Sequence, residues 1–132
     1  LKVINDMYGH AVGDIAIRAV VRAIREIIRA DDLIFRWGGD EFFIIMVGLD
    51  AESAYKRVSR MEAMLTNLRI DGVNHPLTIA VSHAFENFDD VSRLEATIEA
   101  ADAKMYRQKQ SRKTGAAPQF MPSLQAESSR RL

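Results

Sequence analysis

The chain has 132 residues, a length that suits one domain with a single hydrophobic core. Eighteen basic side chains balance eighteen acidic ones, so no net field favours nucleic acid or an anionic membrane as a partner. The absence of cysteine excludes disulfides and thiolate zinc sites. No apolar run approaches the roughly 20 residues of a membrane helix, and no signal peptide is evident, so we expect a cytoplasmic chain.

Two helices are predicted in the first third of the chain. The first is short, with Leu1, Ile4 and Tyr8 on one face, and Gly9 is placed to end it. The second spans residues 14 to 29, where apolar residues recur at helical spacing, and Asp14 is a candidate N-cap. Because many of these residues are β-branched, burial against a sheet must stabilise the second helix.

A β-hairpin is predicted over residues 33 to 47, where two apolar runs flank Gly38-Gly39. Tight turns often need a positive φ, which glycine adopts without a Cβ penalty, and the missing Cβ atoms also let a ligand approach the backbone. Asp40 and Glu41 follow on an emerging strand, so their side chains should leave on opposite faces. One acid can then hold a cation while the other does separate work. The alternative is a solvated turn that carries two acids.

The second half of the chain predicts helix, strand and helix. Asp50 is a plausible N-cap for a helix that extends to Arg69, and its charged residues Lys56, Arg57, Arg60 and Glu62 are predicted to form a solvated face. Residues 77 to 85 predict a strand, and residues 90 to 109 predict a helix that a capping box opens at residues 92 to 95. Residues 114 to 132 lack periodicity and predict a disordered tail.

The histidines in this half give no sign of a metal site. His75 and His83 have no acidic or histidine partner at ligand spacing, so we interpret both as structural or exposed residues.

The hairpin turn carries a family resemblance. Residues 38 to 42 spell the signature G-G-D-E-F, and the chain resembles diguanylate cyclases, which condense two GTP into cyclic di-GMP. Residues 1 to 14 follow the family pattern F-K-x-x-N-D-x-x-G-H-x-x-G-D with leucine in the first place, and residues 101 to 109 are similar to A-D-x-A-L/M-Y-x-A-K. The sequence departs from the family at Ala80, Ser82 and His83, and Lys113 stands where arginine is usual.

The resemblance implies an α/β fold like a polymerase palm, a ferredoxin-like arrangement with a central, mostly antiparallel sheet flanked by helices. It covers residues 1 to 113, which would form one GGDEF domain. Family members carry a first strand, with a metal-binding aspartate, just before the position of Leu1. Because that segment is not in this chain, we expect an N-terminally incomplete domain with exposed strand edges.

The resemblance also implies the site residues. Asp40 would bind Mg²⁺ or Mn²⁺ beside the Gly38-Gly39 backbone, and Glu41 would bind a second metal or activate the attacking hydroxyl. Asn5 and Asp14 are implied to contact the guanine base of GTP. The alternatives are that Asp14 is only a helix cap and that Asn5 faces solvent. The residues implied to contact the phosphates are Lys2, Lys109 and Lys113.

A second ligand site is implied ahead of the hairpin. Arg29 and Asp32 match an R-x-x-D motif at which cyclic di-GMP inhibits many family members, with the arginine and the aspartate both contacting the product. The alternative is structural, with an arginine at a helix C-terminus followed by a turn.

The resemblance implies catalysis by a homodimer, because each domain holds one GTP. Two function classes compete on this basis: a diguanylate cyclase, and an inactive GGDEF module that binds GTP or cyclic di-GMP. A fragment that does not fold alone is the third possibility.

Overall fold

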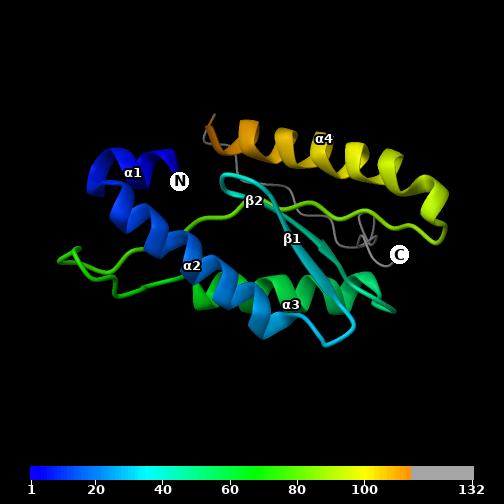
Figure 1. Ribbon diagram of the computed structural model, residues 1–132, viewed down its shortest axis with the longest axis horizontal. Helices are drawn as coiled ribbons and strands as arrows, with labels where there is room; N and C mark the ends of the chain where they lie inside the picture. Colours follow the sequence, from blue (N-terminus) through cyan, green and yellow to red (C-terminus); the bar gives the residue numbers. More distant parts are fainter. Residues whose placement is uncertain (114–132) are drawn as a thin grey trace.

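The computed structural model describes residues 1–113, so the predicted C-terminal tail lies outside the described residues. Its elements in chain order are α1 (Lys2–Tyr8), α2 (His10–Ile27), β1 (Leu33–Gly38), β2 (Glu41–Ile45), α3 (Ala51–Met64), the 3-10 helix η1 (Val91–Arg93) and α4 (Leu94–Lys113). Figure 1 shows the β1–β2 hairpin with α2 and α3 on one side and α4 on the other. The predicted α/β class is confirmed.

The two N-terminal helices meet at Gly9. Gly9 ends α1 with φ 88°, and its N–H donates to the carbonyl oxygen of Asn5, as the glycine signal predicts. The second helix begins immediately afterwards at His10. Asp14 therefore lies inside α2, and the prediction that it caps this helix is wrong.

The core forms between α2, α3 and the chain that follows the hairpin. Val20, Ile24 and Ile27 of α2 are buried against Val58 and Met61 of α3. As predicted, Asp50 caps α3, because its Oδ1 accepts a 2.8 Å hydrogen bond from the Ser53 N–H. The helix ends at Met64, earlier than the predicted Arg69, because Leu68 pairs its backbone with Leu77.

The predicted solvated face of α3 is wrong for Arg57, whose side chain is only 11% exposed, whereas Arg60 is exposed as predicted and Glu62 is half-buried. Arg57 donates to Asp32 and to the carbonyl oxygen of Ile27, each at 3.3 Å. Arg60 donates to the carbonyl oxygen of Glu26 at 2.8 Å. Glu62 Oε1 lies 3.3 Å from His83 Nδ1, which supplies the acidic partner that residue spacing did not reveal.

The sheet of the described residues is the antiparallel pair of β1 and β2. Phe35 opposes Phe43 in the register, and their ring centroids are 6.2 Å apart. The ladder shifts between Arg36 and Gly38, which leaves Trp37 at a bulge with 65% of its surface exposed. The predicted hairpin is thus confirmed, with an irregularity just ahead of its turn.

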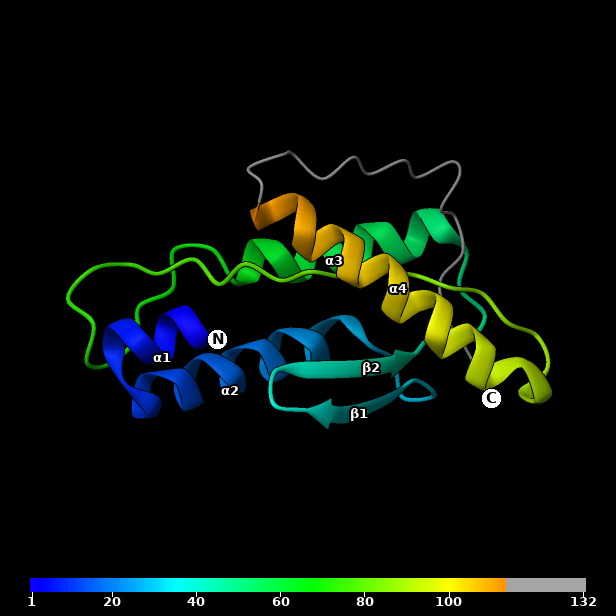
Figure 2. The ribbon, with the colours of Figure 1, turned by 90° about the horizontal axis from the view of Figure 1, so that it is seen from above.

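The predicted strand over residues 77 to 85 is not a regular strand. Leu77 forms an isolated bridge with Leu68, and the Ile79 N–H donates to the carbonyl oxygen of Leu65, but residues 78 to 85 join no ladder. In Figure 2, this segment runs alongside α4. The His83 N–H donates to Gln108 Oε1 at 2.5 Å, which fixes the segment to that helix.

The last helix also starts differently from the prediction. Asp90 caps η1 by accepting from the Ser92 N–H at 3.0 Å, so the cap is Asp90 in place of the predicted box that begins at Ser92. Four apolar residues that recur at helical spacing on α4 are half-buried, and all of them except Leu94 line a cavity: Leu94, Ile98, Ala101 and Met105.

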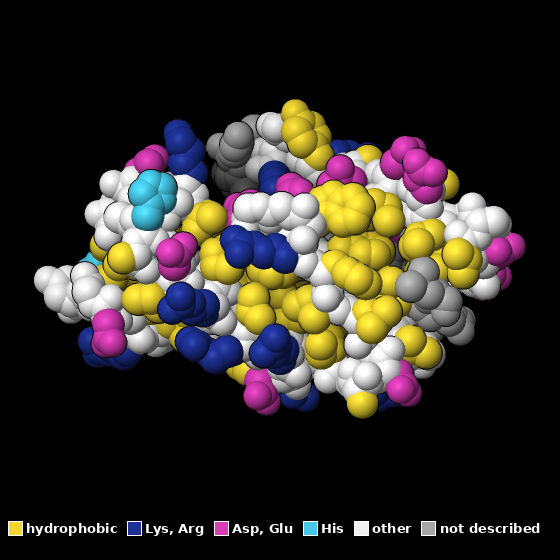
Figure 3. All heavy atoms as spheres, viewed as in Figure 1, with side chains coloured by type: hydrophobic (Ala, Val, Ile, Leu, Met, Phe, Trp, Pro, Cys, Tyr) yellow, Lys and Arg dark blue, Asp and Glu magenta, His cyan; other side chains and the backbone are white. Residues whose placement is uncertain are grey.

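That cavity has a volume of about 400 Å³ and lies between β2 and residues 79 to 85. Apolar side chains of α2 form one wall and those of α4 form another. In the face of Figure 3, apolar side chains gather over the middle of the molecule, below α4. Among residues 1–113, no helix has both the length and the apolar character needed to cross a membrane.

Candidate functional site

The hairpin turn consists of Gly39 and Asp40, which the Gly38–Glu41 pair closes. Arg36 holds it in place, because Nε and Nη2 donate to the carbonyl oxygen of Gly39 at 3.0 and 2.5 Å. Neither Gly38 nor Gly39 has a positive φ, so the predicted conformational reason for these glycines is wrong. A Cβ at either position would meet nothing within 4 Å, so the backbone is open to a ligand.

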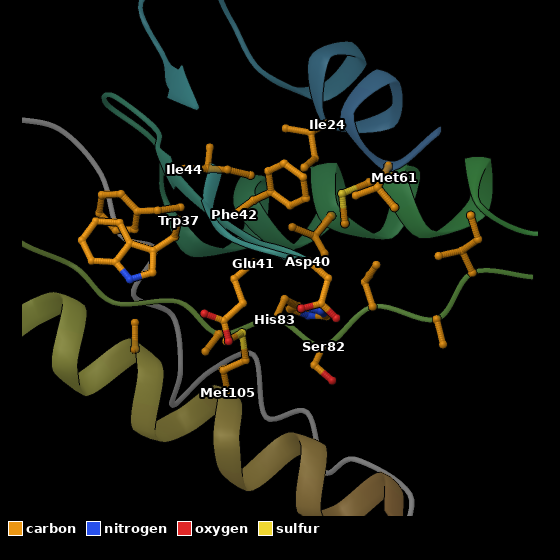
Figure 4. A pocket seen from close by; sticks show the side chains of 18 of the residues that line it. Ile24, Trp37, Asp40, Glu41, Phe42, Ile44, Met61, Ser82, His83 and Met105 are labelled. Carbon is orange, nitrogen blue, oxygen red and sulfur yellow. The ribbon is translucent and has the colours of Figure 1, made fainter. Parts of the chain in front are cut away.

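The two acids of the turn point the same way. Asp40 belongs to the turn, and Glu41 begins β2, so the alternation of a strand does not separate their side chains. Figure 4 shows both carboxylates directed toward the segment that carries Ser82 and His83. The prediction of opposite faces is therefore wrong. Half of the Asp40 side chain and 40% of the Glu41 side chain are exposed, so both remain accessible.

Elements from both ends of the described chain meet at this turn. Lys109 of α4 places Nζ 3.7 Å from Glu41 Oε1, although 68 positions separate the two residues in the numbering of the chain. The backbone nitrogen of Leu1 lies 3.9 Å from Asp40 Oδ2. Leu1, Asp40, Glu41 and Lys109 all line the cavity described above. A cation and two anions thus share one open cavity mouth.

The remaining residues implied for GTP binding lie on α1, α2 and α4. Asn5 is half-buried on α1, and Asp14 is exposed on α2. Lys2 is 91% exposed and lies 3.9 Å from Asp6, so the structure does not bring it to the acids of the turn. Lys113 is the last residue of α4, and its side chain lies outside what the structure describes.

The Arg29–Asp32 motif has a clear structural role. Asp32 is buried, and its Oδ2 accepts from the Arg29 N–H at 2.8 Å and from Arg57 at 3.3 Å. Its Oδ1 accepts from the Val47 N–H at 2.9 Å. One carboxylate therefore joins the end of α2, the end of the hairpin and α3. Arg29 itself is exposed.

A preformed metal cage is absent from the described part of the chain. Residues 1–113 contain no group of three or more histidine, cysteine or acidic residues that could hold an ion by themselves. Mg²⁺ commonly binds one or two carboxylates, keeps several waters and shares the phosphates of a nucleotide. The adjacent, exposed carboxylates of Asp40 and Glu41 fit an ion that arrives with its nucleotide.

Sequence reasoning missed two contributors to this region. Arg36 was not singled out, although a charged residue on a strand just ahead of a glycine turn is a usable signal. Arg57 was assigned to a solvated face, and no local pattern reveals its partner Asp32, which lies 25 positions away.

Comparisons with known proteins agree on one family. The family model described as "Diguanylate cyclase, GGDEF domain" matches residues 1–115. The chain is 39% identical over 109 residues to a probable diguanylate cyclase, DgcC, of Escherichia coli K12, and 33% identical over 111 residues to diguanylate cyclase A of Treponema denticola. These matches cover 82% and 83% of the chain but only 29% and 30% of the relatives.

Two solved structures from Pseudomonas aeruginosa are similar as well. One is diguanylate cyclase SiaD in complex with its activator SiaC, with a TM-score of 0.70, 26% identity, and coverage of 83% of this chain and 42% of that one. The other is the GGDEF domain of TpbB, also called YfiN, with a TM-score of 0.66, 28% identity, and coverage of 99% and 69%.

Proposed function

The chain belongs to the GGDEF family of diguanylate cyclases, and on that premise we propose that residues 1–113 supply one half of a site that condenses two GTP into cyclic di-GMP. The 3′-hydroxyl oxygen of one GTP would form a bond to the α-phosphorus of the other, and the bond to pyrophosphate would break. A second transfer in the reverse sense closes the ring and releases a second pyrophosphate. The observation that carries the proposal is the meeting of Asp40, Glu41 and Lys109 at one open turn.

The residues at the turn would act mainly through position and charge. Bound Mg²⁺ or Mn²⁺ would supply charge neutralisation for the phosphates, and Asp40 and Glu41 would hold it. Lys109 now neutralises Glu41 at 3.7 Å, so an incoming triphosphate would compete for the same ammonium group. The bare backbone at Gly38 and Gly39 would admit the phosphates closely, because no side chain stands above it.

The base would lie toward the junction of α1 and α2. Asn5 can donate and accept through its amide, and Asp14 can accept from the N1–H and exocyclic amine that distinguish guanine from adenine. Lys2 and Lys113 are proposed to contact the phosphates. Because each domain would hold one GTP, the reaction needs a homodimer in which two such turns face each other. The proposal includes a cytoplasmic location, where GTP is supplied.

Product inhibition at Arg29 and Asp32 is part of the same proposal. The exposed Arg29 guanidinium is open to guanine or phosphate. Asp32 has both oxygens engaged, so cyclic di-GMP could receive its carboxylate only in exchange for a bond such as the one from Arg57. Binding of product would then change the contact between the hairpin and α3.

A catalytically silent binding module is the second candidate function. It is favoured by the lack of a third acidic ligand beside Asp40 and Glu41 within residues 1–113. Such a module would bind GTP or cyclic di-GMP through the same residues without turnover.

One experiment separates the two functions. The purified chain is incubated with GTP and Mg²⁺, cyclic di-GMP is followed by chromatography, and circular dichroism is recorded on the same sample. Product from a folded chain supports the cyclase, and its loss in Asp40→Ala shows that the turn makes it. A folded chain that binds GTP without forming product supports the binding module. A folded chain that binds neither GTP nor cyclic di-GMP refutes both candidate functions.

A further inference from the structure

Gly13 lies within α2 at the point where α1 packs against it. The residue is buried, and a Cβ built on its backbone would lie 1.8 Å from Asn5 Oδ1 and 2.9 Å from Asn5 Cγ. Atoms that are not bonded cannot approach so closely, so any side chain at this position would displace the Asn5 amide. Glycine destabilises a helix interior relative to alanine, and Gly13 has no positive φ to require it. The close approach of Asn5 is therefore the feature that needs glycine.

The Asn5 amide is held by contact alone. Within residues 1–113, its side chain forms no hydrogen bond, while its backbone N–H and C=O are used in α1. The residue is half-buried, and neither polar atom of its side chain is among the fully buried, unpaired atoms of the described residues. Its donor and acceptor groups are thus kept for a ligand. The residue after Gly13 is Asp14, which is exposed on α2.

We propose that Gly13 is a positioning residue for guanine recognition, because the Asn5 amide occupies the space that a side chain at position 13 would fill, the seat of this amide. The inference rests on the proposed function, which assigns Asn5 and Asp14 to the base. It adds that selectivity for guanine depends on a residue that never contacts the nucleotide. A methyl group at position 13 should move the amide and weaken binding of GTP while leaving binding of ATP unchanged.

A double-mutant cycle on the full chain tests this role. Affinities for GTP and for ATP are measured by competition against a fluorescent GTP analogue, for the unchanged chain, Gly13→Ala, Asn5→Ala and the double variant. We expect each single change to weaken GTP binding about tenfold, as for the loss of one hydrogen-bonding group, with ATP binding unaffected. In the Asn5→Ala background, Gly13→Ala should cost nothing further, because the atoms that it would strike are gone.

Additive losses in the cycle, or full GTP affinity in Gly13→Ala, would overturn the inference while leaving the proposed function intact. Asn5→Ala with unchanged selectivity for guanine would instead refute the assignment of Asn5, and this inference with it. Ala11→Gly, at an exposed position of the same helix, is the matched control and should alter stability but not selectivity. If Gly13→Ala fails to fold, recovery of the dichroism signal in the double variant supports the seat, and its absence refutes it.

Discussion

The Asp32–Arg57 pair should be a main determinant of stability. The Asp32 side chain is 1% exposed and the Arg57 side chain 11% exposed, so neither charge is well solvated. Removing one partner of a buried ion pair costs about 3–5 kcal/mol, because the other charge is left without compensation. For Arg57→Ala we expect the lower end, about 3 kcal/mol, since the N–H groups of Arg29 and Val47 still hydrogen-bond the carboxylate.

Asp32→Ala should be the more severe change. It leaves the N–H groups of Arg29 and Val47 without their acceptor, at about 1–3 kcal/mol each, and it also leaves Arg57 unpaired. The total should reach the upper end of the range, about 4–5 kcal/mol, which is a large share of the 5–15 kcal/mol typical of a domain. The double variant should lose less than the sum of the two single losses, because the residues interact directly.

Urea denaturation, followed by circular dichroism and by the fluorescence of Trp37, measures these free energies of unfolding. Arg60→Ala is the matched control on the same helix, because Arg60 is exposed and donates to one carbonyl oxygen; about 1 kcal/mol or less is expected. If Arg57→Ala costs no more than Arg60→Ala, the pair is not a buried structural link and the reasoning is wrong.

Three further predictions concern the turn and the start of the last helix. Asp40→Ala should lower cyclic di-GMP synthesis at least about 100-fold but leave product binding at Arg29 intact by calorimetry; equal loss of both would mean that one site is misplaced. Lys109→Met should raise the KM for GTP more than it lowers kcat, and an unchanged KM would argue against a phosphate contact. A hydrogen bond from the Ser92 backbone, with a smaller effect from the Ser92 side chain, holds the pKa of Asp90 below its ordinary value of 3.8. The cap therefore contributes its full stabilisation above pH 3.8, and this stabilisation is lost as the pH falls through the folded pKa. NMR shifts of the η1 residues that Asp90 caps should follow that titration in the unchanged chain and not in Asp90→Asn.

Local patterns predicted much of the fold because they depend on near neighbours. Gly9 ends α1, Asp50 caps α3, and the apolar runs around Gly38-Gly39 form the hairpin as expected. The start of α2 was misplaced because Asp14 is a good cap by type, whereas the glycine before His10 had already redirected the chain. Capping propensity alone does not tell which of several candidate residues begins a helix.

Contacts between distant residues were the part that the sequence could not supply. Lys109 was assigned to the site by resemblance, and its 3.7 Å approach to Glu41 depends on how α4 lies against the hairpin. Arg57 and Asp32 carry ordinary surface residue types, and only the packing of α3 on the end of α2 buries them. The orientation of the two acids likewise depends on where the strand begins, because Asp40 lies in the turn and only Glu41 follows the alternation of β2.

The segment from Leu77 to Phe85 shows why a strand pattern is insufficient for a strand. The backbones of Leu77 and Ile79 bond to residues at and after the end of α3, so alternation directs those of Ala80, Ser82 and Ala84 to the opposite side. Within residues 1–113, those three residues form no backbone hydrogen bond, and they line the 400 Å³ cavity beside β2. A segment becomes a strand only beside a partner strand, because its N–H and C=O groups need hydrogen-bond partners there.

The two sides of this cavity could both pair with a strand placed between them, as in the larger sheet expected from the resemblance. One side is β2, which pairs with β1 on its other edge, and the other is the extended segment, in which Ala80, Ser82 and Ala84 form no backbone hydrogen bond within residues 1–113. Apolar walls from α2 and α4 mean that a strand placed there would be covered on both faces, which favours a continuous apolar run over an alternating one. We therefore expect that adding such a strand ahead of Leu1, as the family resemblance implies, raises the urea midpoint and protects the N–H groups of Ala80, Ser82 and Ala84 from hydrogen exchange. Unchanged exchange at those three residues would show that the cavity is not the place of the first strand.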